Sequence, residues 1–121
     1  MQLDIQCQGF DLTEGIRTHT RRRLAFALGR TALHVTRVAV LLADINGPRG
    51  GCDKRCRIRV RLHAAIEVVV EDTESDLYTA IDRAAERVGR AVVRQVRRQR
   101  QTDLSLARAQ LDAAVTQGLP S

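Results

Sequence analysis

The feature that most constrains the fold is a strict alternation of charged and apolar side chains over residues 55–62. The charged members are Arg55, Arg57, Arg59 and Arg61, and the apolar members are Cys56, Ile58, Val60 and Leu62. A period of two residues is that of a β-strand with one face in the core and one in solvent. The alternation resumes over residues 65–71, so the sequence predicts an antiparallel hairpin.

A turn centred near His63 predicts a register for this hairpin. The expected neighbours are Val60 with Ile66 and Ile58 with Val68 on the inner face, and Arg59 with Glu67 and Arg55 with Glu71 on the outer face. Opposite charges that face each other across an antiparallel pair attract. We therefore expect the arginine face to be mainly a lattice of cross-strand ion pairs, with RNA contact as a secondary role.

Two more strands and two helices are predicted around the hairpin. In chain order there is a strand over residues 2–8, a helix from the N-cap Thr13 to about residue 31, a strand over 35–45, the two hairpin strands, and a helix over about 76–100 capped by Thr73 or Ser75. The expected inner stripes are Ile16, Leu24, Ala27 and Leu28 in the first helix and Leu77, Ile81, Ala84, Val88 and Val92 in the second. The order β-α-β-β-β-α predicts an α+β fold in which both helices pack on one face of a four-stranded sheet.

The length of 121 residues allows one domain with its own core. We assign residues 1–100 to this domain and residues 101–121 to a C-terminal tail that is partly disordered or loosely helical. No apolar run approaches the roughly 20 residues of a membrane span, and the first residues lack the apolar core of a secretory signal. With an odd number of cysteines, three, the chain is expected to be cytoplasmic.

The charge of the chain is strongly basic and is carried almost entirely by arginine. Lys and Arg number 20 against 14 Asp and Glu, for a net charge of +6, and Lys54 is the only lysine. The planar guanidinium group matches phosphate oxygens in pairs, which an ammonium group does not. The composition therefore favours a polyanionic partner, provided that the arginines gather on one surface.

The second predicted helix supplies such a surface. Arginines recur every three or four residues, at Arg83, Arg87, Arg90, Arg94 and Arg97, and fall on one side of the helix opposite the apolar stripe. From residue 87 to residue 100 there are six arginines and no acid. Neighbouring like charges destabilise a helix, and the favourable helix dipole covers only the last turn. The stripe therefore predicts binding of a polyanion.

Other basic residues are weaker candidates. Arg21, Arg22 and Arg23 lie in the first helix but spread around it, so solvated charge explains them about as well as binding does. The loop over residues 46–51 is rich in glycine, yet no Gly-Lys-Ser/Thr sequence follows, so it is not a phosphate-binding P-loop. We expect a long hairpin loop that brings Arg49 and Lys54 near the partner.

The sequence offers no catalytic or metal-binding constellation. Cys52 and Cys56 are four residues apart, but the second pair of ligands that zinc needs is missing. Cys7 and Cys56 are expected on inner faces as small apolar residues. The histidines His19, His34 and His63 show no pairing with an acid or a nucleophile. We therefore predict no metal, no cofactor, no small-molecule substrate and no enzymatic activity.

One segment resembles a known family. Residues 70–82, Val-Glu-Asp-Thr-Glu-Ser-Asp-Leu-Tyr-Thr-Ala-Ile-Asp, followed by Arg87, Arg90 and Arg94, resemble the ribosome hibernation-promoting factors. These are also called ribosome-associated inhibitors or sigma-factor modulation proteins, and they typically carry Asp-hydrophobic-Tyr-Ala-Ala-Ile-Asp at the start of the last helix. The Leu12-Thr13-Glu14 segment and the Arg23-Leu24 pair match the N-terminal half. The resemblance covers about residues 1–98.

The resemblance implies a fold like that of a double-stranded-RNA-binding domain with an added strand. It also implies binding in the small-subunit channel for tRNA and mRNA, which silences translation under stress. The residues that it places against RNA are Arg23, Arg87, Arg90 and Arg94, followed by Arg97 and Arg98. Two departures are the valines Val93 and Val96 at positions that are often basic, and a longer loop over 47–54. The dimerising domain of long members is absent from this sequence, so we expect a monomer when the protein is free.

The sequence therefore predicts a short ribosome-associated translation inhibitor, or hibernation factor, that binds small-subunit rRNA and occludes the tRNA and mRNA sites. The candidate RNA-binding residues are Arg21, Arg22, Arg23, Lys54, Arg83, Arg87, Arg90, Arg94, Arg97 and Arg98. One alternative is a double-stranded-RNA-binding protein that acts elsewhere. A second is a protein-binding regulator of transcription, which would need an exposed apolar patch that the sequence does not clearly show.

Overall fold

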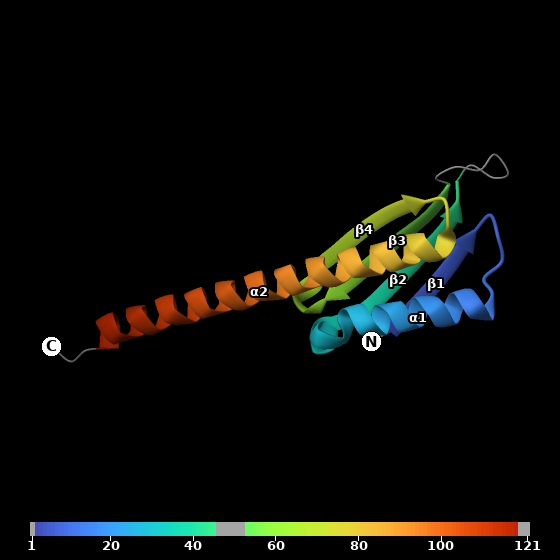
Figure 1. The fold of residues 1–121 in the computed structure, drawn as a ribbon. Coiled ribbons are helices and arrows are strands. Elements are labelled where there is room, and N and C mark those ends of the chain that lie inside the picture. Colours follow the sequence, from blue (N-terminus) through green and yellow to red (C-terminus); the bar gives the residue numbers. More distant parts are fainter. Residues whose placement is uncertain (1, 46–52, 119–121) are drawn as a thin grey trace.

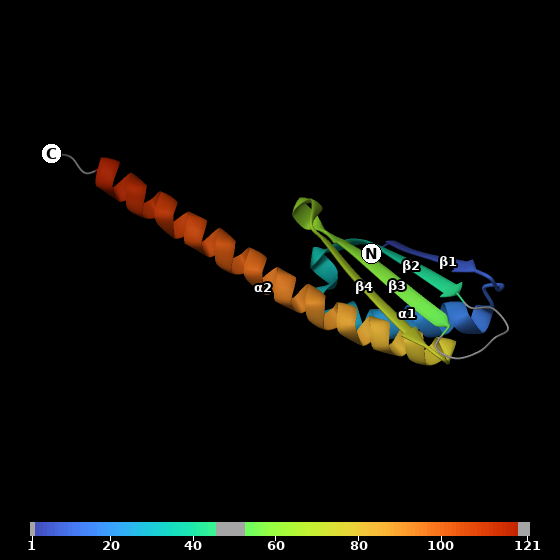
Figure 2. The same ribbon diagram turned by 90° about the horizontal axis from the view of Figure 1, so that it is seen from above.

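The computed structural model describes residues 2–45 and 53–118. Four strands form one sheet and lie across it in chain order: β1 (Gln2–Gln8), β2 (Val35–Asp44), β3 (Lys54–Leu62) and β4 (Glu67–Glu74). Helix α1 (Glu14–Leu28) leads through a 3-10 helix (Gly29–His34) into β2, and α2 (Leu77–Gly118) follows β4. Both helices cover the same face of the sheet (Figures 1 and 2). The predicted α+β fold and its order of elements are confirmed.

The sheet is mixed. β1 pairs in parallel with β2, whereas β2 with β3 and β3 with β4 are antiparallel. The parallel pair requires a crossover, which α1 supplies by returning the chain from the end of β1 to the start of β2. No helix of the described residues covers the other face of the sheet (Figure 2), as expected for a sheet whose outer side chains are charged.

The core between sheet and helices is aliphatic. Its largest fully buried side chains include Leu24 and Leu28 of α1, Ile81, Val88 and Val92 of α2, and Leu42, Ile58 and Val60 of the sheet. The predicted inner stripes are confirmed, with Ala27 and Leu77 only half-buried at their margins. Burying one such side chain contributes about 1.5–3 kcal/mol. This packing determines which side of α2 is left to face solvent.

The two helices approach each other closely at Gly89. A Cβ atom at this position would lie 2.8 Å from the carbonyl oxygen of Ala27 and 3.1 Å from its Cβ. The first distance is shorter than real Cβ contacts, so only glycine allows this spacing. A glycine inside a helix costs about 1 kcal/mol relative to alanine, and the close packing of α1 on α2 accounts for its presence.

The predicted register of the hairpin is wrong by two residues. On the inner face Val60 pairs with Val68 and Ile58 with Val70, and on the outer face Arg61 pairs with Glu67 and Arg57 with Glu71. The turn is longer than expected because Ala64 and Ala65 both adopt left-handed backbone angles, with φ of 67° and 59°. A hydrogen bond from the Leu62 amide to the Ile66 carbonyl closes it at 2.7 Å. A shift of two residues keeps each side chain on its predicted face.

The N-cap of α1 is predicted correctly and that of α2 is not. The Thr13 hydroxyl accepts a hydrogen bond from the Ile16 amide at 3.2 Å. In α2 the cap is Asp76, whose carboxylate accepts hydrogen bonds at 3.0 Å from the amide and from the hydroxyl of Thr79. β4 continues to Glu74 instead of ending at residue 71. The helix therefore starts at Leu77, and Thr73 lies inside the strand.

The predicted ends of both helices are also corrected. α1 ends at Leu28 rather than at residue 31, and the chain continues as the 3-10 helix. α2 does not end near residue 100 but continues to Gly118 and projects beyond the sheet (Figure 1). Residues 101–117 contain no glycine or proline, so nothing in this stretch interrupts the helix. The side chains of residues 101–115 are exposed, and the domain boundary at residue 100 stays a prediction.

Candidate nucleic-acid interface

The arginine stripe of α2 faces solvent along its whole length. The predicted members Arg83, Arg87, Arg90, Arg94 and Arg97 are all exposed, as is the neighbouring Arg98. They are presented by a helix whose opposite side is buried against the sheet, so the side chains can be reached from outside without disturbing the core. The stripe that the sequence indicates is therefore a real surface of the domain.

The stripe has two parts that differ in their partners. Arg83 forms an ion pair with Glu74 at 2.9 Å, and Arg87 Nη1 donates a hydrogen bond to the Glu71 carbonyl oxygen at 2.7 Å. Arg90 pairs with Glu86 one turn earlier, at 3.1 Å. The last part consists of Arg94, Arg97 and Arg98. Within the residues that the structure describes, none of these three forms an ion pair. The uncompensated positive charge is greatest beyond Arg90.

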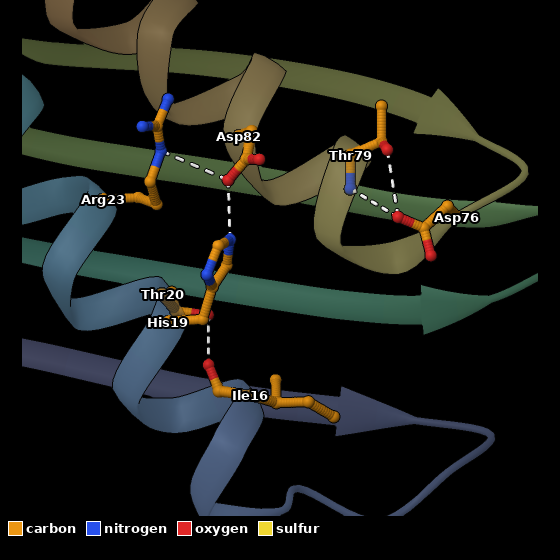
Figure 3. A network of polar contacts seen from close by, with 7 residues as sticks. All are labelled: Ile16, His19, Thr20, Arg23, Asp76, Thr79 and Asp82. Atoms are coloured by element: carbon orange, nitrogen blue, oxygen red, sulfur yellow. Dashed lines mark hydrogen bonds and ion pairs between the residues drawn. The ribbon is translucent and has the colours of Figure 1, made fainter.

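The arginines of α1 contribute unequally. Arg21 and Arg22 are exposed, whereas Arg23 is half-buried between the helices. Arg23 Nε lies 3.2 Å from Asp82 Oδ1, but its N–H finds no hydrogen-bond partner among the described residues, so the contact is electrostatic only. Figure 3 shows this side chain beside the carboxylate of α2. Asp82 thus partly neutralises Arg23, a residue that the family resemblance places against RNA.

The same carboxylate reveals a pairing that the sequence did not indicate. His19 Nε2 lies 2.6 Å from Asp82 Oδ1 (Figure 3), and the His19 ring meets the Tyr78 ring edge-on, with centroids 4.7 Å apart. The expectation that His19 lacks an acidic partner is therefore wrong. The partners are 63 residues apart, a distance over which no spacing rule applies. The contact ties α1 to the first turns of α2 and helps to orient the stripe.

Lys54 is held inside a cluster of carboxylates. Its Nζ lies 3.0 Å from Asp44 Oδ2 and 3.4 Å from Asp53 Oδ2, and the hydrogen bond to Asp44 is the main reason why the pKa of Lys54 is raised. Two negative charges therefore face one positive charge. This arrangement joins the end of β2 to the start of β3, and it engages the Lys54 ammonium group in contacts within the protein. The loop residue Arg49 lies outside the described residues.

The outer face of the sheet carries the predicted ion-pair lattice. Its pairs are Arg57 with Glu71 at 2.9 Å, Arg61 with Glu67 at 3.2 Å, Arg37 with Asp4 at 3.1 Å and Arg55 with Glu71 at 3.9 Å. Because the hairpin is shifted, Glu67 pairs with Arg61 and not with Arg59 as expected, whereas the expected pair of Arg55 with Glu71 forms. Exposed pairs of this kind contribute about 0–1 kcal/mol each. They chiefly neutralise the face.

The cysteines behave as small apolar residues. Cys56 is fully buried, and burial raises the pKa of its thiol to about 12. Cys7 is half-buried, and burial raises its pKa as well. Among the described residues no group of three or more His, Cys, Asp or Glu could hold a metal ion; Cys52 lies outside them. The described helices include none that is long and apolar enough to cross a membrane.

Comparison with known families identifies the group to which this domain belongs. Residues 3–100 match the family described as sigma 54 modulation protein / S30EA ribosomal protein. The chain belongs to this family. The match includes β1 to β4, α1 and the stripe of α2 up to Arg100, and it confirms the resemblance noted in the sequence. The family consists of ribosome-associated factors and is not known for enzymatic activity.

Solved structures of similar fold support the assignment. The N-terminal domain of Protein Y from Thermus thermophilus is 27% identical, with a TM-score of 0.64 over 78% of this chain and 98% of that one. A ribosomal subunit interface protein from Coxiella burnetii shares the fold at 16% identity, with a TM-score of 0.65 over 78% of this chain and 97% of that one. The chain has no match among curated proteins.

Proposed function

We propose that this protein is a ribosome-associated hibernation factor that inhibits translation by binding small-subunit rRNA through the arginine stripe of α2. The carrying observation is the run of exposed arginines beyond Arg90, which have no ion pair among the described residues. Like charges without counter-charges destabilise a helix, and RNA phosphates would remove that repulsion by neutralising them. Family membership supports the ribosome as the source of the phosphates.

Several neighbouring residues extend the proposed surface. Arg21 and Arg22 are exposed on α1, and the half-buried Arg23 side chain lies beside Asp82 of α2. A rigid helix that presents arginines at intervals of three and four residues can follow successive phosphates of a folded RNA. A domain seated in the small-subunit channel would exclude tRNA and mRNA by occupying their space. Such a factor would act in the cytoplasm, where it meets ribosomes.

The decisive experiment measures binding to small subunits as a function of salt. Each phosphate contact contributes nearly one unit to the slope of log affinity against log salt concentration. Replacing Arg87, Arg90 and Arg94 with glutamine should flatten that slope by about two to three units. A control variant with Arg30→Gln and Arg108→Gln removes charge from the 3-10 helix and from the end of α2, and it should keep the wild-type slope.

Two further experiments test which RNA the protein binds and whether binding inhibits translation. Sedimentation with small subunits, large subunits and free duplex RNA distinguishes a ribosomal factor from a general duplex-RNA binder, because only the first prefers small subunits. A translation assay with wild-type protein should show inhibition that disappears in the triple glutamine variant. Equal binding to duplex RNA and small subunits would favour the general binder. Inhibition that survives in the triple variant would rule out Arg87, Arg90 and Arg94 as part of the binding surface.

A further inference from the structure

The outer face of the sheet contains a shallow depression of about 370 Å³. It lies on the side of the sheet that the helices leave uncovered (Figure 2), and is therefore separate from the α2 stripe. Four arginines from β2 and β3 line it, Arg37, Arg57, Arg59 and Arg61, together with Asp4 and Glu67. A volume of this size is at the lower end of the range for small-ligand sites, about 300–1,000 Å³.

The strand register explains the surroundings of Arg59, one of the residues that line the depression. Along the row that crosses the sheet through Arg59, its neighbours are Ala39 on β2 and Val69 on β4, with Asp4 beyond Ala39 on β1. In the two adjacent rows the β4 position is a glutamate, Glu67 or Glu71, and these glutamates pair with the arginines opposite them. The row of Arg59 has valine in that place. The side chains of Ala39 and Val69 are small and apolar, so they rise less far above the sheet than the charged side chains of the rows on either side.

Among the described residues, Arg59 is thus the arginine of this face that lacks a carboxylate partner. Within the described residues it forms no ion pair, and Asp4, the acid of its own row, is held by Arg37 at 3.1 Å. Beside it lie apolar groups that water can reach: Val69 is 49% exposed, and Ala39 is half-buried. A free guanidinium group next to an apolar floor suits a ligand that joins an anion to a flat, weakly polar group.

We propose that this depression binds a nucleoside phosphate, with the phosphate on Arg59 and the base over the apolar side chains of Ala39 and Leu41, which line the depression. Arg57 and Arg61, each paired with a glutamate of β4, lie on the two sides of the site. Base faces pack on apolar and guanidinium surfaces with little regard to sequence. The nucleoside phosphate is either a free nucleotide or one residue of an RNA strand, because both present the same chemistry.

The test follows backbone amide signals of the isotopically labelled full chain during titration with three probes. The probes are inorganic phosphate, adenosine monophosphate and a short single-stranded oligoribonucleotide. We expect saturable shifts at Ala39, Arg59 and Val69 with at least one of the two nucleoside probes, and weaker binding of phosphate alone. Saturation by the mononucleotide identifies a site for a free nucleotide. A response to the oligonucleotide only identifies a site for an RNA strand.

Two variants and one control make the test specific. Arg59→Gln should weaken binding by about tenfold or more, as expected when a charge-assisted contact is lost. Val69→Glu places an acid directly opposite Arg59, as in the adjacent rows, and should abolish binding while the fold is kept. Arg30→Gln removes an exposed arginine elsewhere and should have no effect. The proposal is overturned if shifts are absent or lie on α2, if phosphate binds as well as the nucleoside probes, or if Arg59→Gln binds like the wild type.

Discussion

The arginines of α2 and those of β3 belong to the same small domain, yet their surroundings are different. On β3, Arg57 and Arg61 each face a glutamate on the neighbouring strand, at 2.9 and 3.2 Å. On α2, Arg94 and Arg97 have no such partner among the described residues. A count of arginines treats the two sets alike. Whether an acid stands at the neighbouring position decides which of them has charge to offer a partner.

The difference also has a geometric side. The β3 arginines lie on the face of a sheet with a paired strand on each side, so an acid on a neighbouring strand can reach them. The outer side of α2 has neighbours only at its margins. There Arg83 and Arg87 reach β4, at Glu74 and at the Glu71 carbonyl. Further along the helix, Val96 and Gln99 lie beside Leu62 and Ile66 at the hairpin turn. These two hairpin residues are apolar, which leaves the later arginines to the solvent or to a ligand.

Charge reversal on α2 should have the largest effect. Replacing Arg87, Arg90 and Arg94 with glutamate removes three phosphate contacts and adds repulsion from the RNA. We expect loss of cosedimentation with small subunits and loss of translation inhibition. The thermal midpoint should stay within a few degrees of wild type, because these side chains are exposed. Normal binding would show that Arg87, Arg90 and Arg94 contribute no more to binding than the paired arginines of β3 do.

The close contact between the helices should rank second, since it fixes the direction of the stripe. In Gly89→Ala the new Cβ would meet the Ala27 carbonyl oxygen at 2.8 Å, and α2 would have to move. We expect a loss of about 1–3 kcal/mol in the free energy of unfolding, measured by denaturant titration. A gain in stability, as alanine normally gives in a helix, would mean that the helices separate without cost.

A single change in the β3 lattice should matter less. Arg61→Gln breaks the exposed pair with Glu67 and should change the free energy of unfolding by less than about 1 kcal/mol. Binding to small subunits should keep its salt slope. If affinity fell as in the α2 variants, the lattice would belong to the ribosomal interface, and the contrast between the two sets of arginines would fail.

The smallest effect is expected from removing residues 101–121. The side chains of residues 101–115 are exposed, so their loss should leave the thermal midpoint within a few degrees of that of the full chain. The salt slope for small subunits should also persist, because the stripe ends before this point. A fall in stability or affinity would place part of the functional domain beyond residue 100.

Local patterns predicted most of the fold. The alternation over residues 55–62 indicated the strand and both of its faces, and the repeat of Ile81, Val88 and Val92 indicated the buried side of α2. The predicted register of the turn between β3 and β4 was wrong because Ala64 and Ala65 adopt positive φ. Alanine rarely adopts such angles, so the residue type does not predict them. The cap of α2 was misplaced for a related reason, since β4 runs further than its apolar alternation.

The candidate site also has a part that the sequence predicts and a part that only the fold shows. The stripe of α2 was visible from the sequence because helical periodicity alone puts its members on one side. The contacts of Arg23 and His19 with Asp82 and the carboxylates around Lys54 were not visible, and they change how much charge each residue can offer. The low row around Arg59 also appears only when the strands are aligned, because a shift of two residues decides that Val69 faces it.

The sequence by itself determined the elements, their buried faces and the helix side that carries arginine, because these depend on periods of two and of 3.6 residues within one segment. Tertiary structure alone decided the hairpin register, the spacing of the helices at Gly89 and the partners of each charge. These depend on atoms that lie far apart in the chain and meet only after packing. An ion pair is worth little unless its atoms are within a few ångströms, so a sequence shows which charges exist, and only the fold shows which remain free.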